Sequence, residues 1–409
     1  MRILCFILFT ICANTALASV WTVGVGKAHQ TITAAIAAAA QHDTILVLSG
    51  IYQEQNIVIN KALTLKGLNY PVLDGEHKYQ VISITADGVV LEGFKIVNSG
   101  ISSMEDLSGV KIYESNNVVI RDNILENTFF GIFAENVLNC TIENNQLKSY
   151  SVQEQQSGNG IHCWKSDSMR IIGNSITGHR DGIYFEFVKN SIIWRNVSEK
   201  NIRYGLHFMF SNDDSYISNV FTNNGSGVSV MFSNRIKMFN NFFEENWGDA
   251  SHGILLKEIS DGYMQGNHFS KNTSGIFMEG ANRIYMSYNS FENNGWALKI
   301  QASCMDVVLE KNNFAGNTFD IGTNGSLVQN TFKNNYWDKY QGYDLDKDRI
   351  GDVSYRPVSM YSMIVEKYPS AMILFRSFIT SLLDKTEKII PSLTPENLKD
   401  DAPLMRKAF

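Results

Sequence analysis

The middle of the chain carries a group of soft metal ligands. His207 and Met209 lie in the segment RYGLHFMFSN, and Met231 follows in GVSVMFSN, 22 residues after Met209. Imidazole and thioether groups suit Cu(I), which is a soft ion. These residues predict a site for transient Cu(I) binding, with His162 in an equivalent, earlier segment as a fourth candidate ligand.

The same residues fit a second interpretation, in which they form a covered surface. Neighbouring methionines are unusual on the surface of a soluble protein. Either the C-terminal tail or a partner protein could therefore cover them, and both alternatives stay open at this point. Further side chains that we expect on this partner or ligand face are Trp164, Tyr184, Glu186, Lys257 and Glu258.

A carbohydrate-active protein is a further alternative. Trp164 and Tyr184 could stack on sugar rings, but glycoside hydrolysis needs two carboxylates flanking the scissile bond. The candidate acids are Glu135, Glu186 and Glu279. The coil spacing described below puts Glu186 about 10 Å from Glu135 and about 19 Å from Glu279. Neither distance makes a convincing catalytic pair, so we predict a binding protein and not an enzyme.

An Asp-rich segment forms a third constellation near the C-terminus. Asp344, Asp346 and Asp348 have the spacing of an EF-hand calcium loop, and Asp352 follows them. Arg349 stands where such a loop has Gly, and the twelfth position lacks Glu. We expect a turn whose carboxylates accept hydrogen bonds from their own backbone, with a weak calcium site as the alternative.

An internal repeat must position all of these residues. A Gly or Ala followed by an aliphatic residue recurs, mostly at steps of 22 or 23 residues, at Gly109, Gly131, Gly160, Gly182, Gly205, Gly227, Gly253, Gly275 and Ala297. Fourteen residues after each of the first eight stands an Asn, at Asn123, Asn145, Asn174, Asn196, Asn219, Asn241, Asn267 and Asn289. A unit of about 22 residues made of short alternating runs is one coil of a parallel β-helix, whose strands stack about 4.8 Å apart. The sequence therefore predicts an all-β solenoid.

Alternation within the repeat separates inside from outside. Residues one and three positions after the Gly face inward, and residues two and four positions after it face outward. His207, Met209 and Met231 then share one outward face on two adjacent coils. Cys163 faces inward, so we interpret it as a core residue.

Composition agrees with a solenoid. The chain of 409 residues has 40 Asn, of which 34 lie between Asn116 and Asn335, and six Pro, of which five lie beyond residue 350. Proline would remove a ladder hydrogen bond, whereas Asn tolerates left-handed turns and can bond to the Asn of the next coil. The net charge of −6, with no block of Lys or Arg, argues against nucleic acid as the main partner.

The N-terminus has the features of an export signal. A basic Arg2, an apolar run of about ten residues and the A-x-A site ending at Ala18 predict cleavage before Ser19. We expect a signal peptide over 1–18, a cap with the first coils over 19–108, regular repeats over 109–335, and an Asp-rich turn with a helical or extended tail over 336–409. A helix over Thr31–Gln41 should cover the open first coil. A second, over Ala371–Thr386, should pack on the solenoid or on a partner.

The chain resembles the NosD family, the periplasmic maturation proteins of nitrous oxide reductase, over essentially its whole mature length. The resemblance rests most firmly on RYGLHFMFSN followed by GVSVMFSN. The segments NNYWDKYQGYDLDKDRIGD and PLMRKAF add to it, and DTILVLSGIYQE is shared with many carbohydrate-binding and sugar-hydrolase β-helices.

This resemblance implies a right-handed, pectin-lyase-like parallel β-helix that works in the periplasm with an ABC transporter. The transporter consists of the ATPase NosF and the permease NosY, and the copper chaperone NosL acts with them. The resemblance implies that together they assemble the copper centre of nitrous oxide reductase, with the NosD-type protein as a binding and delivery component. His207, Met209 and Met231 would then fit transient Cu(I) handling, because an incomplete shell of soft ligands lets copper leave.

Overall fold

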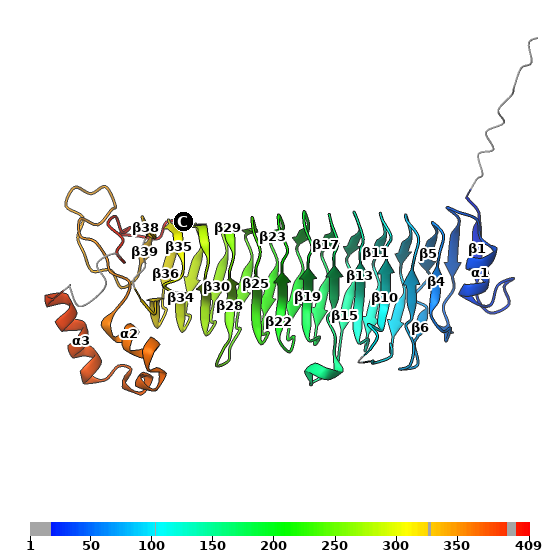
Figure 1. The fold of residues 1–409 in the computed structure, drawn as a ribbon, viewed down its shortest axis with the longest axis horizontal. Helices are drawn as coiled ribbons and strands as arrows, with labels where there is room; N and C mark the ends of the chain where they lie inside the picture. Colours follow the sequence, from blue (N-terminus) through cyan, green and yellow to red (C-terminus); the bar gives the residue numbers. More distant parts are fainter. Residues whose placement is uncertain (1–17, 103, 326–328, 391–397) are drawn as a thin grey trace, which may run out of the picture.

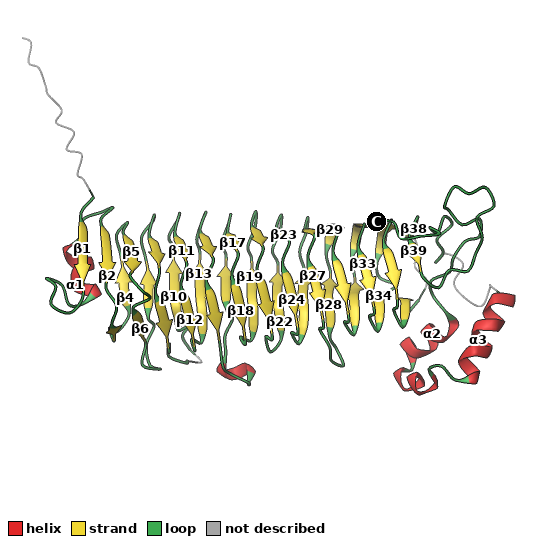
Figure 2. Cartoon of the chain, turned by 180° about the vertical axis from the view of Figure 1, so that it is seen from behind, coloured by secondary structure: helices red, strands yellow, loops and turns green. Residues whose placement is uncertain are grey.

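Parallel strands form three sheets that stack coil on coil into one elongated, right-handed β-helix, as predicted (Figure 1). The structure, a computed structural model, describes residues 18–102, 104–325, 329–390 and 398–409. The helix α1 (Ile32–Ala38) lies at one end of the solenoid, and α2 (Met360–Lys367) and α3 (Phe378–Ile389) lie at the other (Figure 2). All but the last residue of the predicted signal peptide lies outside the described residues.

Each complete coil contributes one short strand to each sheet, and the incomplete coils at the ends leave the three sheets with 14, 12 and 13 strands. The first sheet consists of β1 (Val20–Val23), β2 (Thr44–Val47), β5 (Thr64–Gly67), β8 (Val90–Glu92), β11 (Val119–Arg121), β14 (Thr141–Glu143), β17 (Arg170–Ile172), β20 (Ile192–Trp194), β23 (Ser215–Ile217), β26 (Lys237–Phe239), β29 (Ser260–Gln265), β32 (Asn282–Ser287), β35 (Met305–Glu310) and β38 (Thr331–Lys333). The second sheet consists of β4 (Ile57–Ile59), β7 (Ile82–Ile84), β10 (Ser108–Tyr113), β13 (Phe130–Glu135), β16 (Ile161–Trp164), β19 (Asp181–Glu186), β22 (Tyr204–Met209), β25 (Ser226–Met231), β28 (His252–Lys257), β31 (Ser274–Glu279), β34 (Trp296–Ile300) and β37 (Phe319–Gly322). The third sheet consists of β3 (Ile51–Tyr52), β6 (Val72–Asp74), β9 (Lys95–Val97), β12 (Ile124–Glu126), β15 (Gln146–Lys148), β18 (Ser175–Thr177), β21 (Val197–Glu199), β24 (Val220–Thr222), β27 (Phe242–Glu244), β30 (His268–Ser270), β33 (Ser290–Glu292), β36 (Asn313–Ala315) and β39 (Tyr336–Trp337).

The interior is filled by columns of apolar side chains, as the alternation predicts. The residues one and three positions after each Gly are buried, Cys163 among them. Aromatic rings stack along the inside of the third sheet from Phe221 to Trp337, with centroids 4.1–5.6 Å apart. The Gly column has a steric cause, because a Cβ at Gly205 would lie 2.7 Å from the carbonyl oxygen of Gly227 on the next coil.

Buried asparagine side chains form a ladder along one corner of the solenoid, which confirms the predicted amide contacts. The side chain of each Asn after the first accepts, through its Oδ1, hydrogen bonds from the backbone N–H and Nδ2 of the Asn one coil before it, and that of Asn123 accepts from the N–H of Phe94. The ladder consists of Asn123, Asn145, Asn174, Asn196, Asn219, Asn241, Asn267, Asn289, Asn312 and Asn335. Because every amide is paired, the ladder satisfies the buried polar groups at this corner.

A second ladder runs along another corner and begins irregularly. It consists of Asn201, Asn224, Asn246, Asn272, Asn294 and Asn317. His179 occupies the preceding position, where its backbone N–H donates to Asn201 Oδ1 but neither ring nitrogen has a hydrogen-bond partner. Burial lowers the pKa of this histidine to about 4.

The N-terminal end is closed by α1, which confirms a helix within the predicted segment. The Thr31 hydroxyl accepts a hydrogen bond from the N–H of Ala34, and the Glu54 carboxylate accepts from the N–H of Ile32. At the other end of α1, the Lys61 ammonium donates to three carbonyls, which include that of Ile36. The buried face of α1 therefore covers the open end of the first coils.

The C-terminal residues close the opposite end. The Asp400 Oδ2 accepts hydrogen bonds from the backbone N–H and Nδ2 of Asn335, at 2.9 and 3.0 Å, and from Trp337 Nε1 at 3.1 Å. The chain then runs back along the last coils, where Lys407 pairs with Glu292 at 2.9 Å. Asp400 thus takes the place of the next Asn of the ladder.

The helical tail differs from the predicted segment. The sequence predicts one helix over Ala371–Thr386, but the structure has the 3₁₀ helix η2 (Pro369–Leu374), a break, and then α3. The Ser377 hydroxyl accepts a hydrogen bond from the N–H of Thr380 and so starts a new helix inside the predicted one. No helix in the described ranges is long and apolar enough to span a bilayer.

Replacing Asp400 by Ala should destabilise the last coils. Three buried donors would lose their acceptor, which we expect to lower the free energy of unfolding by about 3 kcal/mol. Urea unfolding and hydrogen exchange at residues 312–337 measure the effect. The control is Asp401→Ala, because Asp401 is an exposed carboxylate that bonds Ser354 and Lys399. Equal unfolding midpoints for the two variants would contradict this role.

His179→Asn should reduce the acid sensitivity of the fold. The pKa of His179 is lower in the folded than in the unfolded chain, so its contribution to stability is present above pH 6.5 and is lost as the pH falls toward 4. Between pH 7 and pH 5 the native protein should therefore lose about 2 kcal/mol more stability than the variant. Urea unfolding at the two pH values tests this, and an unchanged pH slope would refute it.

Candidate functional site

The outward face of the second sheet carries three columns of side chains. Relative to the Gly of each coil, the columns lie one position before, two positions after and four positions after it. The last column runs in register through Trp164, Glu186, Met209, Met231, Lys257 and Glu279. The structure therefore brings the two predicted methionines side by side on β22 and β25.

His207 lies on β22 beside Met209, and its Cα partner on β25 is Ser229. Its position agrees with the sequence, but its environment differs from that of an open outward residue, because it is only 6% exposed. The rings of Tyr184 and Tyr204 lie against it, each with its centroid 4.9 Å away. Met209 and Met231, by contrast, are half-buried.

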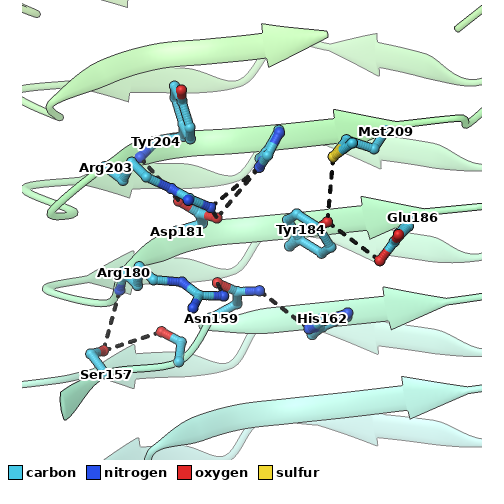
Figure 3. Close-up of polar contacts among 12 residues, drawn as sticks. Ser157, Asn159, His162, Arg180, Asp181, Tyr184, Glu186, Arg203, Tyr204 and Met209 are labelled. Atoms are coloured by element: carbon cyan, nitrogen blue, oxygen red, sulfur yellow. Dashed lines mark hydrogen bonds and ion pairs between the residues drawn. The ribbon is translucent and has the colours of Figure 1, made fainter. Parts of the chain in front are cut away.

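An ion pair that the sequence interpretation missed lies next to His207. Figure 3 shows its two members, the buried Asp181 and the partly exposed Arg203. The carboxylate of Asp181 accepts hydrogen bonds from Arg203 Nε and Nη2, at 2.9 and 2.6 Å, and its Oδ2 lies 3.6 Å from His207 Nδ1. Burial alone would raise the pKa of Asp181, but the contacts with His207 and Arg203 hold it below its ordinary value. The carboxylate is therefore charged at neutral pH.

The period of the repeat was the signal for this pair. Arg203 follows Asp181 by 22 residues, and two further pairs have the same spacing and the same two-pronged contact. They are Asp213 with Arg235 and Asp261 with Arg283. An Asp followed one coil later by an Arg thus predicts an ion pair between adjacent coils.

Tyr184 links His207 to the methionine column. Its hydroxyl lies 3.4 Å from Glu186 Oε2 and 3.6 Å from Met209 Sδ, so it can donate its hydrogen to either (Figure 3). Burial and the neighbouring Glu186 raise the pKa of Tyr184 to about 12. The hydroxyl therefore stays protonated and acts as a hydrogen-bond donor at physiological pH.

His162 is separated from the other candidate ligands by Tyr184, whose ring lies between the two histidines in the column. The Nδ1 of His162 lies 3.2 Å from Asn159 Nδ2, and the Asn159 Oδ1 accepts a hydrogen bond from Arg180 at 3.3 Å. Burial, with the positive charge of Arg180, lowers the pKa of His162 to about 3. His162 is therefore a neutral imidazole at neutral pH.

Two polar atoms next to the methionines have no hydrogen-bond partner. They are His207 Nε2 and Ser229 Oγ, which lie on neighbouring strands next to Met209 and Met231. Buried polar atoms are normally paired. The unpartnered imidazole nitrogen beside two thioethers is what a soft cation requires.

The remaining residues of the predicted partner face are dispersed. Trp164 is half-buried, with Lys165 Nζ 4.2 Å from its ring centroid. Lys257 pairs with Glu279 at 3.6 Å, and Glu258 is exposed in the turn that follows β28. These residues border the methionines but do not converge with them.

The Asp-rich turn is compact. One carboxylate oxygen from each of Asp344, Asp346 and Asp348 lies within 4.8 Å of the others. All three accept hydrogen bonds from backbone N–H groups of the turn, and Asp352 Oδ2 accepts one from the N–H of Leu345. These contacts agree with a turn that bonds its own backbone, and a calcium ion there stays a prediction.

Comparisons of sequence place the chain beside one family. The model of the family described as "Periplasmic copper-binding protein (NosD)" matches residues 148–342, a range that contains His162, His207, Met209 and Met231. A protein of Pseudomonas aeruginosa named "Probable ABC transporter binding protein NosD" is 28% identical over 86% of both chains. A protein of Stutzerimonas stutzeri with the same name is 27% identical over 88% of this chain and 86% of that relative.

Solved structures share the fold. The catalytic unit of an α-1,3-glucanase from Streptomyces thermodiastaticus has a TM-score of 0.58 at 12% identity, covering 75% of this chain and 65% of that one. The A-module of the Azotobacter vinelandii mannuronan C-5 epimerase AlgE6 has a TM-score of 0.54 at 13% identity, and the match covers 76% of this chain and 95% of that module. At such low identity these likenesses establish the β-helix architecture and nothing about activity.

Proposed function

The chain belongs to the NosD family, and from this premise we propose that it is a periplasmic accessory protein that binds or relays Cu(I) during assembly of the copper centre of nitrous oxide reductase. The observation that carries the proposal is the convergence of His207, Met209 and Met231 on one face, with the Nε2 of His207 unpartnered. Copper is the cargo of this site.

The residues on the face suggest how the cargo enters and leaves. Met has three rotatable side-chain bonds, so Met209 and Met231 can turn their sulfur atoms toward His207 without a change in the backbone. For Met209 to bind, the Tyr184 hydroxyl transfers its hydrogen bond from the sulfur to Glu186. A shell of one imidazole and two thioethers is incomplete, which leaves room for an acceptor protein to take the copper.

We infer the partners of this protein from its membership of the NosD family. The protein acts with an ABC transporter composed of a NosY-type permease and a NosF-type ATPase, receives copper from a NosL-type chaperone, and serves nitrous oxide reductase. The helical tail supports a docking role, because it exposes an unusual cluster of large apolar side chains. These are Met372, Ile373, Leu374, Phe375, Phe378, Ile379, Leu382, Ile389 and Ile390.

A binding role fits the outward face better than carbohydrate chemistry. In the register of the second sheet, Glu186 is two coils from Glu135 and four coils from Glu279. These separations correspond to about 10 and 19 Å, whereas paired glycosidase carboxylates lie about 5–9.5 Å apart. Release of sugar from uronate polymers by the purified protein would favour the rival function.

Removal of both thioethers should weaken Cu(I) binding. In a competition titration with a chromophoric Cu(I) chelator, we expect the Met209→Ala/Met231→Ala double variant to bind Cu(I) at least about 100-fold more weakly than the native protein. The matched control is Met104→Ala/Met305→Ala, which removes two exposed thioethers elsewhere. If the two double variants bind Cu(I) with equal affinity, Met209 and Met231 are not copper ligands.

Loss of the apolar tail surface should uncouple the protein from its transporter. Phe378→Ser/Leu382→Ser changes one face of α3, where Phe378 is 81% exposed, and should abolish co-purification with the permease in detergent while Cu(I) affinity stays unchanged. Ile51→Ser/Val152→Ser removes exposed apolar side chains far from the tail and serves as the control. Retained co-purification of the tail variant would refute this docking surface.

A further inference from the structure

The two histidines of the outward column have different polar neighbours. Asp181 and Arg203 lie against His207, whereas Asn159 and Arg180 lie against His162. A histidine can bind a metal ion only through a nitrogen that carries a lone pair, and its other nitrogen then usually donates a hydrogen bond. The neighbours therefore decide which ring nitrogen is free.

We propose that Asp181 is a positioning residue for the copper site. Held by Arg203, it keeps His207 in the tautomer with hydrogen on Nδ1 and the lone pair on Nε2, while Asn159 keeps His162 in the opposite tautomer. His207 is then the imidazole ligand, and His162 is excluded from the site. This inference rests on the proposed copper function and names a residue that acts through His207 without touching copper.

The surroundings of His207 favour hydrogen on Nδ1. Oδ2 of the buried Asp181 carboxylate lies 3.6 Å from that nitrogen and can only accept. Arg203 Nη2 carries two hydrogens, of which one bonds Asp181 Oδ2 at 2.6 Å and the other can reach Nδ1 at 3.5 Å, so the surroundings of Nε2 weigh most in the choice of tautomer. With hydrogen on Nε2 instead, a buried N–H would have no acceptor, a situation that native structures rarely contain.

The surroundings of His162 favour hydrogen on Nε2. The guanidinium of Arg180 has donors only, so the Asn159 group that faces it at 3.3 Å must be the carbonyl Oδ1. The Nδ2 of Asn159 then faces His162 Nδ1 at 3.2 Å and donates to it. In the neutral ring the hydrogen therefore sits on Nε2, and no lone pair remains free on either nitrogen.

The first test needs no copper. In copper-free protein labelled with ¹⁵N-histidine, two-bond nitrogen–proton correlations distinguish the two tautomers, and His207→Gln and His162→Gln assign the signals. We expect native His207 with hydrogen on Nδ1 and native His162 with hydrogen on Nε2. Asn159→Asp should convert His162 to the tautomer of His207. A native His207 with hydrogen on Nε2, or an unchanged His162 in Asn159→Asp, would overturn the inference.

The second test measures Cu(I) affinity. Asp181→Asn keeps the shape of the side chain but removes its charge, and should weaken binding about 10- to 100-fold, as expected for a residue that orients a ligand. The matched control is Asp213→Asn, which breaks an ion pair of the same geometry that faces no histidine. His162→Gln should leave affinity unchanged.

The proposed copper function and the proposed role of Asp181 can be refuted independently of each other. Equal affinity in Asp181→Asn and Asp213→Asn, or a loss of affinity in His162→Gln, would overturn the assignment of Asp181 and His162 while copper binding itself stands. A native protein that does not bind Cu(I) would overturn the proposed function, and the tautomers of the copper-free protein would still decide the positions of the hydrogens. If Asp181→Asn fails to fold, the tautomers of His207 and His162 in the native protein, together with the tautomer of His162 in Asn159→Asp, decide whether the inference holds.

Discussion

The stacking of each coil on the next, fixed by the asparagine ladder, is the constraint on which the rest of the structure depends. An Asn at the same corner of successive coils can pair its amide only when the coils are in register. That register converts a spacing of 22 residues in the sequence into contact between adjacent strands. A slip by one residue would exchange the inward and outward faces of every strand.

The candidate copper site is a product of this register. Met209 and Met231 become neighbours because they are one coil apart, and Asp181 meets Arg203 for the same reason. Each coil adds little on its own, but the stack provides a rigid, low-dielectric support on which a charged pair can orient His207. The parts expected to move are the methionine side chains and the Tyr184 hydroxyl, which is consistent with a site that accepts copper and then gives it up.

The periodic part of this account could be predicted from sequence, and the non-periodic part could not. Gly and Asn columns predict the coils, the inward residues and the pairing of Met209 with Met231. They do not predict that Tyr184 and Tyr204 cover His207, because that depends on the rotamers of rings in neighbouring columns. Asp400 caps the ladder although it lies 65 residues after Asn335 and outside the repeat, so the repeat pattern could not predict it. Asp181 was predictable in principle, since its Arg partner has the spacing of the coil.

The central claim is that Cu(I) binds through His207, Met209 and Met231. X-ray absorption at the copper K edge of the Cu(I)-loaded mature protein tests it most directly, because sulfur and nitrogen neighbours scatter differently. The account predicts one nitrogen and two sulfur neighbours in the native protein, with the sulfur contribution lost in Met209→Ala/Met231→Ala. A native spectrum with nitrogen and oxygen neighbours only, or sulfur that persists in the double variant, would contradict it.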